Sequence, residues 1–502
     1  MTKEAASGSR SQSKSRPASR SQGFAKGPAR GKGPGAGQGS GKPLQGQKSV
    51  KSDAPLPPGL AAREAAVRVI AAVLNEGRSF EAAAAKQFED YGLEGRDRGL
   101  ARLIAATVLR RQGELEAILD SYLQKPLQKQ KSLLWPILLA GAAQLLFLQM
   151  PPHAAVGLAV DQARRDRQAA HFNKLVNALL RRVSREGAEA LPALDGVALN
   201  IPQWLMARWR ENYGADTARK IGAASLAEAP LDISVKSDPQ AWAEKLGGTV
   251  LSTGSVRLAA GGRIEDMPGF SEGAWWVQDA AAALPAKLMG DVRGKSIVDL
   301  CAAPGGKTAQ LVSAGAEVTA LDLSPQRIER LQQNLARLGL SAETVAADAG
   351  EWAPERTFDG VLLDVPCTAT GTIRRHPDIL RLKRLEDIAA LAEIQSRLLD
   401  QAAKLVAPGG MLLYCTCSLD AEEGERQIAR FLERNDQFQL APIKAGESGI
   451  AGEWLTPRGE LRTLPFHTPS LTPGHATELP TGEQGKLVGM DGFYAARLVR
   501  QS

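Results

Sequence analysis

Apolar residues recur at helical spacing through residues 60–188, which predicts helices along this whole stretch. Leu133–Leu148 is apolar on nearly every face, as expected of the central helix of a bundle, and Met150-Pro151-Pro152 stops it. We therefore expect an all-helical domain over residues 56–190. The predicted helices are Ala61–Asn75, Arg98–Arg111, Leu133–Leu148, Ala154–Arg165 and Phe172–Arg182.

The pattern changes after residue 195. A helix predicted at Pro202–Tyr213 is followed by two stretches, Leu231–Lys236 and Thr249–Leu258, in which apolar and polar residues alternate as they do in strands. This predicts a small α+β domain over residues 195–275. Such a domain either links its neighbours or docks a nucleic-acid substrate.

From residue 276 to residue 502, short apolar runs alternate with helical segments, the pattern of a parallel α/β sheet. One intervening helix is well specified, because Ser324 can cap it, Pro325 suits its first turn and Gly339 ends it. The predicted strands are Ser296–Leu300, Glu317–Leu321, Glu343–Ala346, Gly360–Leu363, Met411–Tyr414 and Phe493–Leu498.

Charge is distributed unevenly along the chain. The formal net charge is +7, yet residues 1–53 carry +9, so the remaining 449 residues sum to −2. The first segment is rich in Gly, Ser and Gln and poor in large apolar residues, so we expect residues 1–55 to be disordered. Such a basic tail either holds RNA through phosphate contacts or keeps the protein in solution. Any nucleic acid on the folded part must be held by local basic patches.

Four cysteines in 502 residues exclude a disulfide scaffold. They are Cys301, Cys367, Cys415 and Cys417, and no CxxC pair or Cys/His cluster predicts a zinc site. The chain has neither an apolar run long enough to span a bilayer nor the apolar core of a secretory signal. We expect a reduced, cytoplasmic protein.

A glycine-rich turn follows the first predicted strand of the α/β region, at Cys301-Ala302-Ala303-Pro304-Gly305-Gly306-Lys307-Thr308. The two glycines let the backbone approach a ligand, and the next helix offers free N–H groups. The rival motif is a phosphate-binding loop, GxxxxGK[ST], but Cys301 stands where that motif needs glycine. A nucleotide-hydrolase function is therefore disfavoured.

Acids and thiols follow the later strands. Asp322 ends the second strand and suits the hydroxyls of a ribose, and Asp348 ends the third and can contact an adenine. A capping or solvated acid is the alternative for Asp322. Asp364 and Cys367 follow the fourth strand, and Cys417 follows the fifth. A lone cysteine is most often buried, but two strand-end thiols beside one predicted crevice indicate chemistry.

Four motifs together resemble the RNA (cytosine-5) methyltransferases of the Sun/Nop family. They are CAAPGGKT, LLDxPC, GxIRRHPD and TCS, beginning at Cys301, Leu362, Gly371 and Thr416. The helical region adds to the likeness, because four of its segments resemble the NusB-type domain of the members that act on small-subunit ribosomal RNA. These segments are Arg96-Asp97-Arg98, Leu109-Arg110-Arg111, Gln144-Leu145-Leu146 and Asn177–Arg182. The resemblance covers residues 60–500 and implies a Rossmann-like, S-adenosylmethionine-dependent methyltransferase domain behind an RNA-binding NusB-like domain.

The resemblance also implies the chemistry. Cys417 attacks C6 of cytosine, which requires a thiol with a lowered pKa, and C5 then accepts a methyl group from S-adenosylmethionine. Cys367 assists release of the product, and Asp364 contacts the ring. Spacing alone does not separate this scheme from that of DNA methyltransferases, in which the Pro-Cys thiol, here Cys367, attacks. The implied cofactor site comprises Cys301, Ala302, Ala303, Pro304, Gly305, Gly306, Lys307, Asp322, Asp348 and Asp364.

Three basic residues, Arg374, Arg375 and His376, follow the Pro-Cys loop, where they either contact the RNA substrate or form a salt-bridged loop. We interpret Cys415 as a packing residue. The expected product is 5-methylcytidine in 16S ribosomal RNA, made by a monomer that uses no metal and no membrane. Two alternatives stay open, the same chemistry on transfer RNA and an RNA-binding scaffold without catalysis.

Overall fold

The computed structural model describes residues 57–127, 132–258, 263–470 and 488–502. The disorder predicted for residues 1–55 lies outside these ranges. Within them, no helix is both long enough and apolar enough to cross a membrane.

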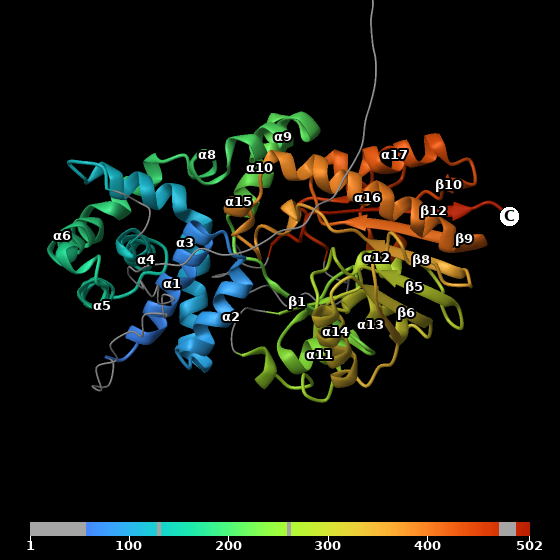
Figure 1. Cartoon of the computed structure of the whole chain (residues 1–502), viewed down its shortest axis with the longest axis horizontal. Helices are drawn as coiled ribbons and strands as arrows, with labels where there is room; N and C mark the ends of the chain where they lie inside the picture. Colours follow the sequence, from blue (N-terminus) through green and yellow to red (C-terminus); the bar gives the residue numbers. More distant parts are fainter. Residues whose placement is uncertain (1–56, 128–131, 259–262, 471–487) are drawn as a thin grey trace, which may run out of the picture. The chain divides into compact units, whose positions relative to one another are not determined.

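The amino-terminal part is helical, as predicted (Figure 1). Its central helix α4 is buried on every face because almost all its residues are apolar, and the helices around it share one hydrophobic core. All five predicted helices are present, and the prediction missed α2, which Ser79 caps by accepting from the N–H of Ala82. The helices are α1 (Leu60–Glu76), α2 (Phe80–Asp90), α3 (Gly95–Ser121), α4 (Leu134–Leu146), α5 (Pro152–Arg165) and α6 (Asn173–Arg182).

A small antiparallel sheet with the order β2-β3-β1-β4 follows, which confirms an α+β segment. The prediction of one strand over Thr249–Leu258 is wrong. The chain turns back at Gly254, which has a left-handed φ of 77°, and so forms two short paired strands. The elements are α7 (Ala188–Ala190), α8 (Gly196–Asn200), α9 (Gln203–Tyr213), α10 (Ala215–Ser225), β1 (Leu231–Val235), α11 (Pro239–Leu246), β2 (Thr249–Val250), β3 (Val256–Leu258) and β4 (Trp275–Val277).

The large sheet has the order β10-β12-β9-β8-β5-β6-β7, with β11 paired to β12. Strands β5 to β9 run parallel, and β10, β11 and β12 add antiparallel pairs at one end. Each of the six predicted strands lies within an observed one. The strands are β5 (Ser296–Leu300), β6 (Glu317–Asp322), β7 (Glu343–Ala346), β8 (Phe358–Asp364), β9 (Val406–Thr416), β10 (Phe438–Leu440), β11 (Leu461–Thr463) and β12 (Phe493–Arg500).

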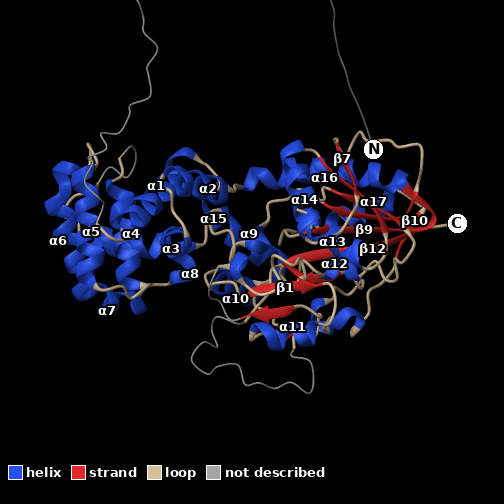
Figure 2. Cartoon of the chain, turned by 90° about the horizontal axis from the view of Figure 1, so that it is seen from below, coloured by secondary structure: helices blue, strands red, loops and turns tan. Residues whose placement is uncertain are grey.

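Helices cover both faces of this sheet, seen in blue beside the red strands of Figure 2. Alternate strand residues face opposite sides, so Leu363 packs with Leu399 of α16 while Leu362 packs with Leu284 of α12. As predicted, Ser324 caps α14 by accepting from the N–H of Arg327. The helices are α12 (Leu284–Lys287), α13 (Gly306–Ser313), α14 (Pro325–Arg337), α15 (Ile379–Leu382), α16 (Leu385–Leu405) and α17 (Glu425–Arg434).

Strand order reverses between β5 and β8. From β5 the chain builds outward through β6 and β7, and then returns to place β8 on the other side of β5. Loops that leave the carboxyl ends of neighbouring strands diverge at such a switch point and leave a crevice for a ligand. The glycine-rich loop after β5 and the Pro-Cys loop after β8 are therefore brought together.

Candidate active site

A cavity of about 310 Å³ lies at this switch point. Its lining includes part of the glycine-rich loop, where Gly305 caps α13 with a left-handed φ of 99° and a side chain would approach Leu331. Gly306 and Lys307, at the N-terminus of α13, line the cavity. Six residues of the predicted cofactor site line the cavity: Ala302, Ala303, Pro304, Gly306, Lys307 and Asp364.

Two of the lining residues form an ion pair. The Nζ of Lys307 donates to Oδ2 of Asp364 at 2.7 Å and lies over the ring of Phe493. Burial opposes the charge on Lys307, but the carboxylate of Asp364 outweighs it, and the pKa of Lys307 is raised. The ammonium is therefore permanently charged near neutral pH.

The two strand-end thiols meet beside this ion pair. The Sγ atoms of Cys367 and Cys417 lie 3.4 Å apart, although 50 residues separate them in sequence. Both side chains are partly exposed, whereas Cys415 is fully buried in the core and its Sγ lies 3.7 Å from Oδ1 of Asp364. The packing role predicted for Cys415 is confirmed, and its thiol also contacts the carboxylate.

The thiol of Cys417 is not acidified in this structure. Its hydrogen bond with Cys367 and its burial both raise its pKa well above that of an ordinary thiol, and the charge of Lys307 only partly offsets them. The expectation of a lowered pKa is thus wrong for the free protein. Attack by this sulfur requires that its proton leave first.

Four predicted cofactor residues do not line the cavity, namely Gly305, which caps α13, and Asp322, Asp348 and Cys301. Asp322 is 1% exposed and accepts from the N–H of Ala303, which shapes the glycine-rich loop from behind. Asp348 pairs with Arg397 and accepts from the N–H of Gly350. Cys301 takes a left-handed φ of 62° at the start of the loop. In this conformation Asp322, Asp348 and Cys301 support the loops, and the contacts of all four residues with a cofactor stay predictions.

The three residues of the basic loop, Arg374, Arg375 and His376, lie in two different environments. Arg375 and His376 line the cavity, and burial lowers the pKa of His376, so that its imidazole is neutral at pH 7. Arg374 is 2% exposed and donates to the carbonyl of Val488, so it lies behind the cavity. The loop is also tied to the helical part, since Asp378 accepts from the N–H of Phe80.

Ion pairs further fix this loop. Arg375 binds both Asp279 and Asp491, with 3.1 Å between its Nε and Oδ2 of Asp491. The salt-bridged loop considered from the sequence is therefore present. Contact between Arg375 or His376 and RNA stays a prediction, and Arg374 is placed to support the loop from within.

The chain is similar to known proteins over most of its length. Residues 287–499 match the family model of the 16S rRNA methyltransferases RsmB/F, and residues 60–185 match that of the NusB family. Ribosomal RNA small subunit methyltransferase B of Xanthomonas campestris is 37% identical over 415 residues, which is 78% of this chain and 92% of that protein. The chain belongs to this methyltransferase family.

Other relatives agree with this placement. The methyltransferase B of Pseudomonas syringae is 36% identical to this chain over 462 residues, covering 87% of this chain and 96% of its own. The crystal structure of PH0851 covers 89% of this chain and 100% of its own, with a TM-score of 0.67 and 24% identity, and so shares its fold. The family resemblance found in the motifs is confirmed, as is a NusB domain followed by a Rossmann-like methyltransferase domain.

The sequence prediction missed an ionisable residue in the lining, Asp299. Asp299 is fully buried in β5, where Oδ2 accepts from the hydroxyl of Thr308 at 2.6 Å and Oδ1 has no partner. Burial raises the pKa of Asp299 to about 7. The available signal was an acid in the otherwise apolar strand end Ile297-Val298-Asp299-Leu300.

Gly371 marks the closest approach of the basic loop to the thiols. Its N–H donates to the carbonyl of Cys417 at 2.8 Å, and a Cβ there would lie 2.0 Å from the carbonyl oxygen of Gly492. No side chain fits without displacing backbone.

We expect Gly371→Ala to lower methyltransferase activity on the order of 100-fold, because the loop must move away from Cys417. Turnover of the purified protein measures this loss of activity, and the melting temperature measures any accompanying loss of stability. Gly99→Ala in α3 is the matched control, since its Cβ would meet open space. Wild-type turnover in Gly371→Ala would contradict the requirement for this close contact.

Proposed function

We propose that the protein transfers a methyl group from S-adenosylmethionine to C5 of a cytosine in 16S ribosomal RNA, through a covalent bond between Cys417 and C6. The observation that carries this proposal is the meeting of two thiols, 3.4 Å apart, where Cys417 interacts electrostatically with Asp364 and Lys307, two residues that line the cavity. Membership of the family, whose relatives are named as small-subunit ribosomal RNA methyltransferases, supports the substrate.

The roles proposed for the two thiols are those that the family resemblance implies, and they fit the chemistry of cytosine. C5 is a poor nucleophile, and addition of the Cys417 sulfur to C6 makes it an enamine carbon. S-adenosylmethionine, when bound, supplies the electrophilic methyl group. A base then takes the C5 proton, and the electron pair of that C–H bond restores the C5–C6 double bond as the sulfur of Cys417 leaves C6 as a thiolate. Cys367 lies beside that sulfur and assists this release, while Asp364 contacts the ring.

The cavity suits this cofactor. The lone Oδ1 of Asp299 is an acceptor without a donor, and the ammonium of the cofactor's methionine portion is a donor that would satisfy it. The N-terminus of α13 and the loop from Ala302 to Lys307 would hold the rest. We therefore assign Asp299 to the cofactor site in addition to the residues predicted from the sequence.

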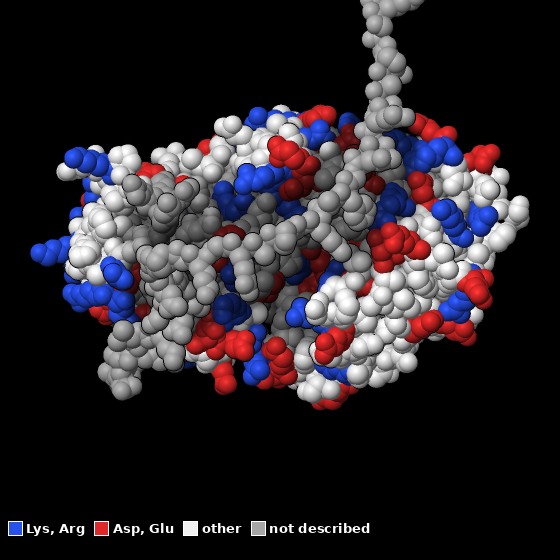
Figure 3. Space-filling view, viewed as in Figure 1, with Lys and Arg blue, Asp and Glu red and all other residues white. Residues whose placement is uncertain are grey.

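The helical domain offers a surface for RNA phosphates. A groove of about 530 Å³ lies between α5 and α6 and is lined by Arg164, Arg181, Arg185 and His153. Basic side chains gather over these helices in Figure 3. Since the described part of the chain has no large excess of positive charge, such a local patch is what phosphate binding requires.

We predict that the wild-type protein converts cytidine to 5-methylcytidine in unmodified 16S ribosomal RNA. Cys417→Ala should abolish the product, because no other group forms the bond to C6. Transfer of labelled methyl groups, followed by nuclease digestion and mass spectrometry of nucleosides, measures both. Methylation of transfer RNA alone would overturn the substrate, and cofactor-free RNA binding without methylation would favour the scaffold alternative.

We also predict that cofactor affinity rises as pH increases through about 7, because a bound ammonium stabilises ionised Asp299, which must lose its proton. Asp299→Asn should weaken binding at least about tenfold and remove this pH dependence. Calorimetric titration of S-adenosylmethionine across this range is the measurement.

A second consequence is independent of the cofactor. Because the pKa of Asp299 is raised, the wild-type protein should lose folding stability as pH rises from the ordinary carboxyl pKa of 3.8 to about 7. Asp299→Asn has no carboxyl group at this position and should not lose stability for this reason in that range.

For cofactor binding, a pH profile of Asp299→Asn that is the same as that of the wild type would refute the assignment of Asp299 to the cofactor site.

A further inference from the structure

A buried carboxylate contacts the residues that directly follow the two thiols in the chain. Glu423 ends a short 3-10 helix, Ala421–Glu423, that follows β9, and its side chain accepts from the hydroxyls of Thr368 and Ser418. Thr368 is the residue after Cys367, and Ser418 is the residue after Cys417. Glu423, Thr368 and Ser418 are all fully buried.

The carboxylate holds the Cys367 loop by two contacts. The N–H of Thr368 donates to Oε1 of Glu423 at 2.9 Å, and the hydroxyl of Thr368 donates to Oε2. A backbone contact and a side-chain contact from one residue fix both the position and the direction of the chain as it leaves Cys367.

The same carboxylate holds the Cys417 loop. The hydroxyl of Ser418 donates to Oε2 of Glu423, lies 3.1 Å from the hydroxyl of Thr368, and accepts from the N–H of Asp420. Both thiol-bearing loops therefore converge on one oxygen atom of Glu423.

Two further groups make the arrangement rigid. Gln395 of α16 donates from Nε2 to Oε1 of Glu423 at 3.0 Å and to the carbonyl of Pro366 at 2.9 Å, which secures the other side of Cys367. The hydroxyl of Tyr414 donates to the carbonyl of Glu423 at 2.7 Å. Fully buried polar groups with all their partners in place are costly to move.

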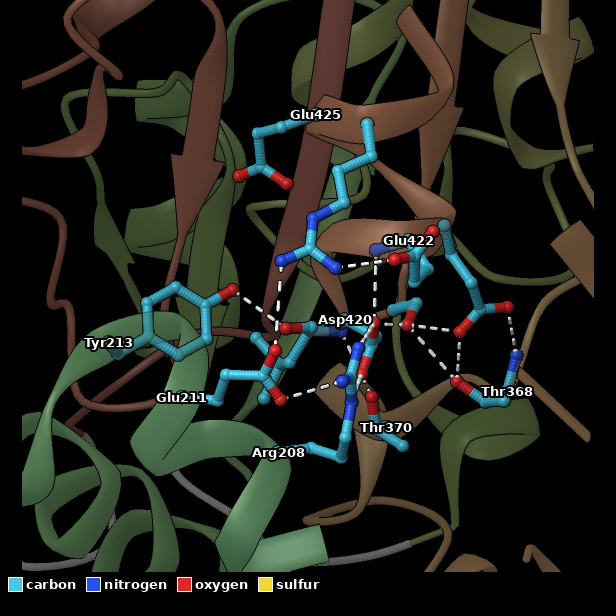
Figure 4. Close-up of polar contacts among 12 residues, drawn as sticks. Arg208, Glu211, Tyr213, Thr368, Thr370, Asp420, Glu422 and Glu425 are labelled. Carbon is cyan, nitrogen blue, oxygen red and sulfur yellow. Dashed lines mark hydrogen bonds and ion pairs between the residues drawn. The ribbon is translucent and has the colours of Figure 1, made fainter. Parts of the chain in front are cut away.

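The turn that carries Glu423 is also held from outside. Arg208 of α9 makes a two-pronged ion pair with Asp420, with contacts of 2.7 and 2.8 Å, and the hydroxyl of Tyr213 donates to the carbonyl of Leu419. Figure 4 shows both side chains reaching from α9 to this turn. The carboxylate thus has a fixed anchor against which the thiol loops are set.

We propose that Glu423 is a positioning residue that sets the separation of Cys367 and Cys417, and that this separation determines how fast the covalent adduct is resolved. The inference rests on the proposed function, because it assigns attack to one thiol and release to the other. Glu423 contacts the residues that follow the thiols, so it acts through Thr368 and Ser418.

Loss of the carboxylate would free both loops together. In Glu423→Ala, the N–H of Thr368 and Nε2 of Gln395 lose an acceptor in a site closed to water, and the loops must shift to find others. In Glu423→Gln, the amide oxygen can keep the two N–H donors, and the amide NH₂ can donate to the two hydroxyls. The glutamine variant therefore removes the charge and keeps the geometry.

The test measures thiol separation and turnover in the full chain. The separation is probed with dibromobimane, which fluoresces once both its arms have reacted with thiols, and mass spectrometry assigns the bridge to Cys367 and Cys417. Methyl transfer to 16S ribosomal RNA gives kcat and KM, and a denaturing gel gives the fraction of enzyme held as the RNA adduct. Glu460→Ala is the matched control, since Glu460 is a buried glutamate of the same domain that binds the hydroxyl of Thr456.

We expect Glu423→Ala to lose the bimane bridge, to lower kcat on the order of 100-fold with KM and cofactor affinity unchanged, and to accumulate the adduct. Glu423→Gln should stay near wild type, and Glu460→Ala should keep the bridge. Thr368→Val, which removes only the hydroxyl, should give an intermediate loss and covers the case in which Glu423→Ala does not fold.

Three results would overturn the inference. The first is wild-type bridging and turnover in Glu423→Ala or Thr368→Val. The second is a loss of bridging and turnover in Glu460→Ala equal to that in Glu423→Ala, and the third is a turnover of Glu423→Gln as low as that of Glu423→Ala. If the wild-type protein itself transfers no methyl group, the proposed function fails instead, and the bimane bridge still reports whether Glu423 sets the thiol separation.

Discussion

The pairing of β8 with β9 is the constraint on which the site depends. These strands run parallel with Asp364 opposite Cys415, so their loops leave the sheet side by side and Cys367 meets Cys417. Side chains alternate between the two faces of a strand, so a slip of one residue would turn Cys415 and Cys417 to the opposite face of the sheet. Register thus converts two distant sequence motifs into one pair of thiols.

Buried charge then shapes the surroundings of that pair. Lys307 is held by Asp364, and Arg375 is held by Asp279 and Asp491, so each buried charge has a partner of opposite sign. Asp299 differs, because one of its oxygens has no partner and its pKa is raised to about 7. A buried acceptor without a donor that also lines a cavity is a place where a ligand gains by binding.

The local pattern of apolar and polar residues predicted most of the fold and part of the site. Apolar runs ending in Gly, Asp or Cys located the strands and their chemistry, and the cap at Ser324 was readable because capping is a local interaction. The sequence did not predict the burial of Arg374, the hairpin at Gly254 or the contacts of Glu423. The burial of Arg374 and the contacts of Glu423 depend on residues far apart in sequence, which periodicity and composition do not encode. The hairpin at Gly254 is local, but its two short strands continue one alternating pattern across the turn.

The most direct test of the proposed chemistry is a denaturing gel of Cys367→Ala incubated with 16S ribosomal RNA and S-adenosylmethionine. If Cys417 attacks and Cys367 serves release, a covalent band of protein and RNA persists in Cys367→Ala and disappears when Cys417→Ala is added. A band in Cys417→Ala and none in Cys367→Ala would contradict the assignment and make Cys367 the nucleophile.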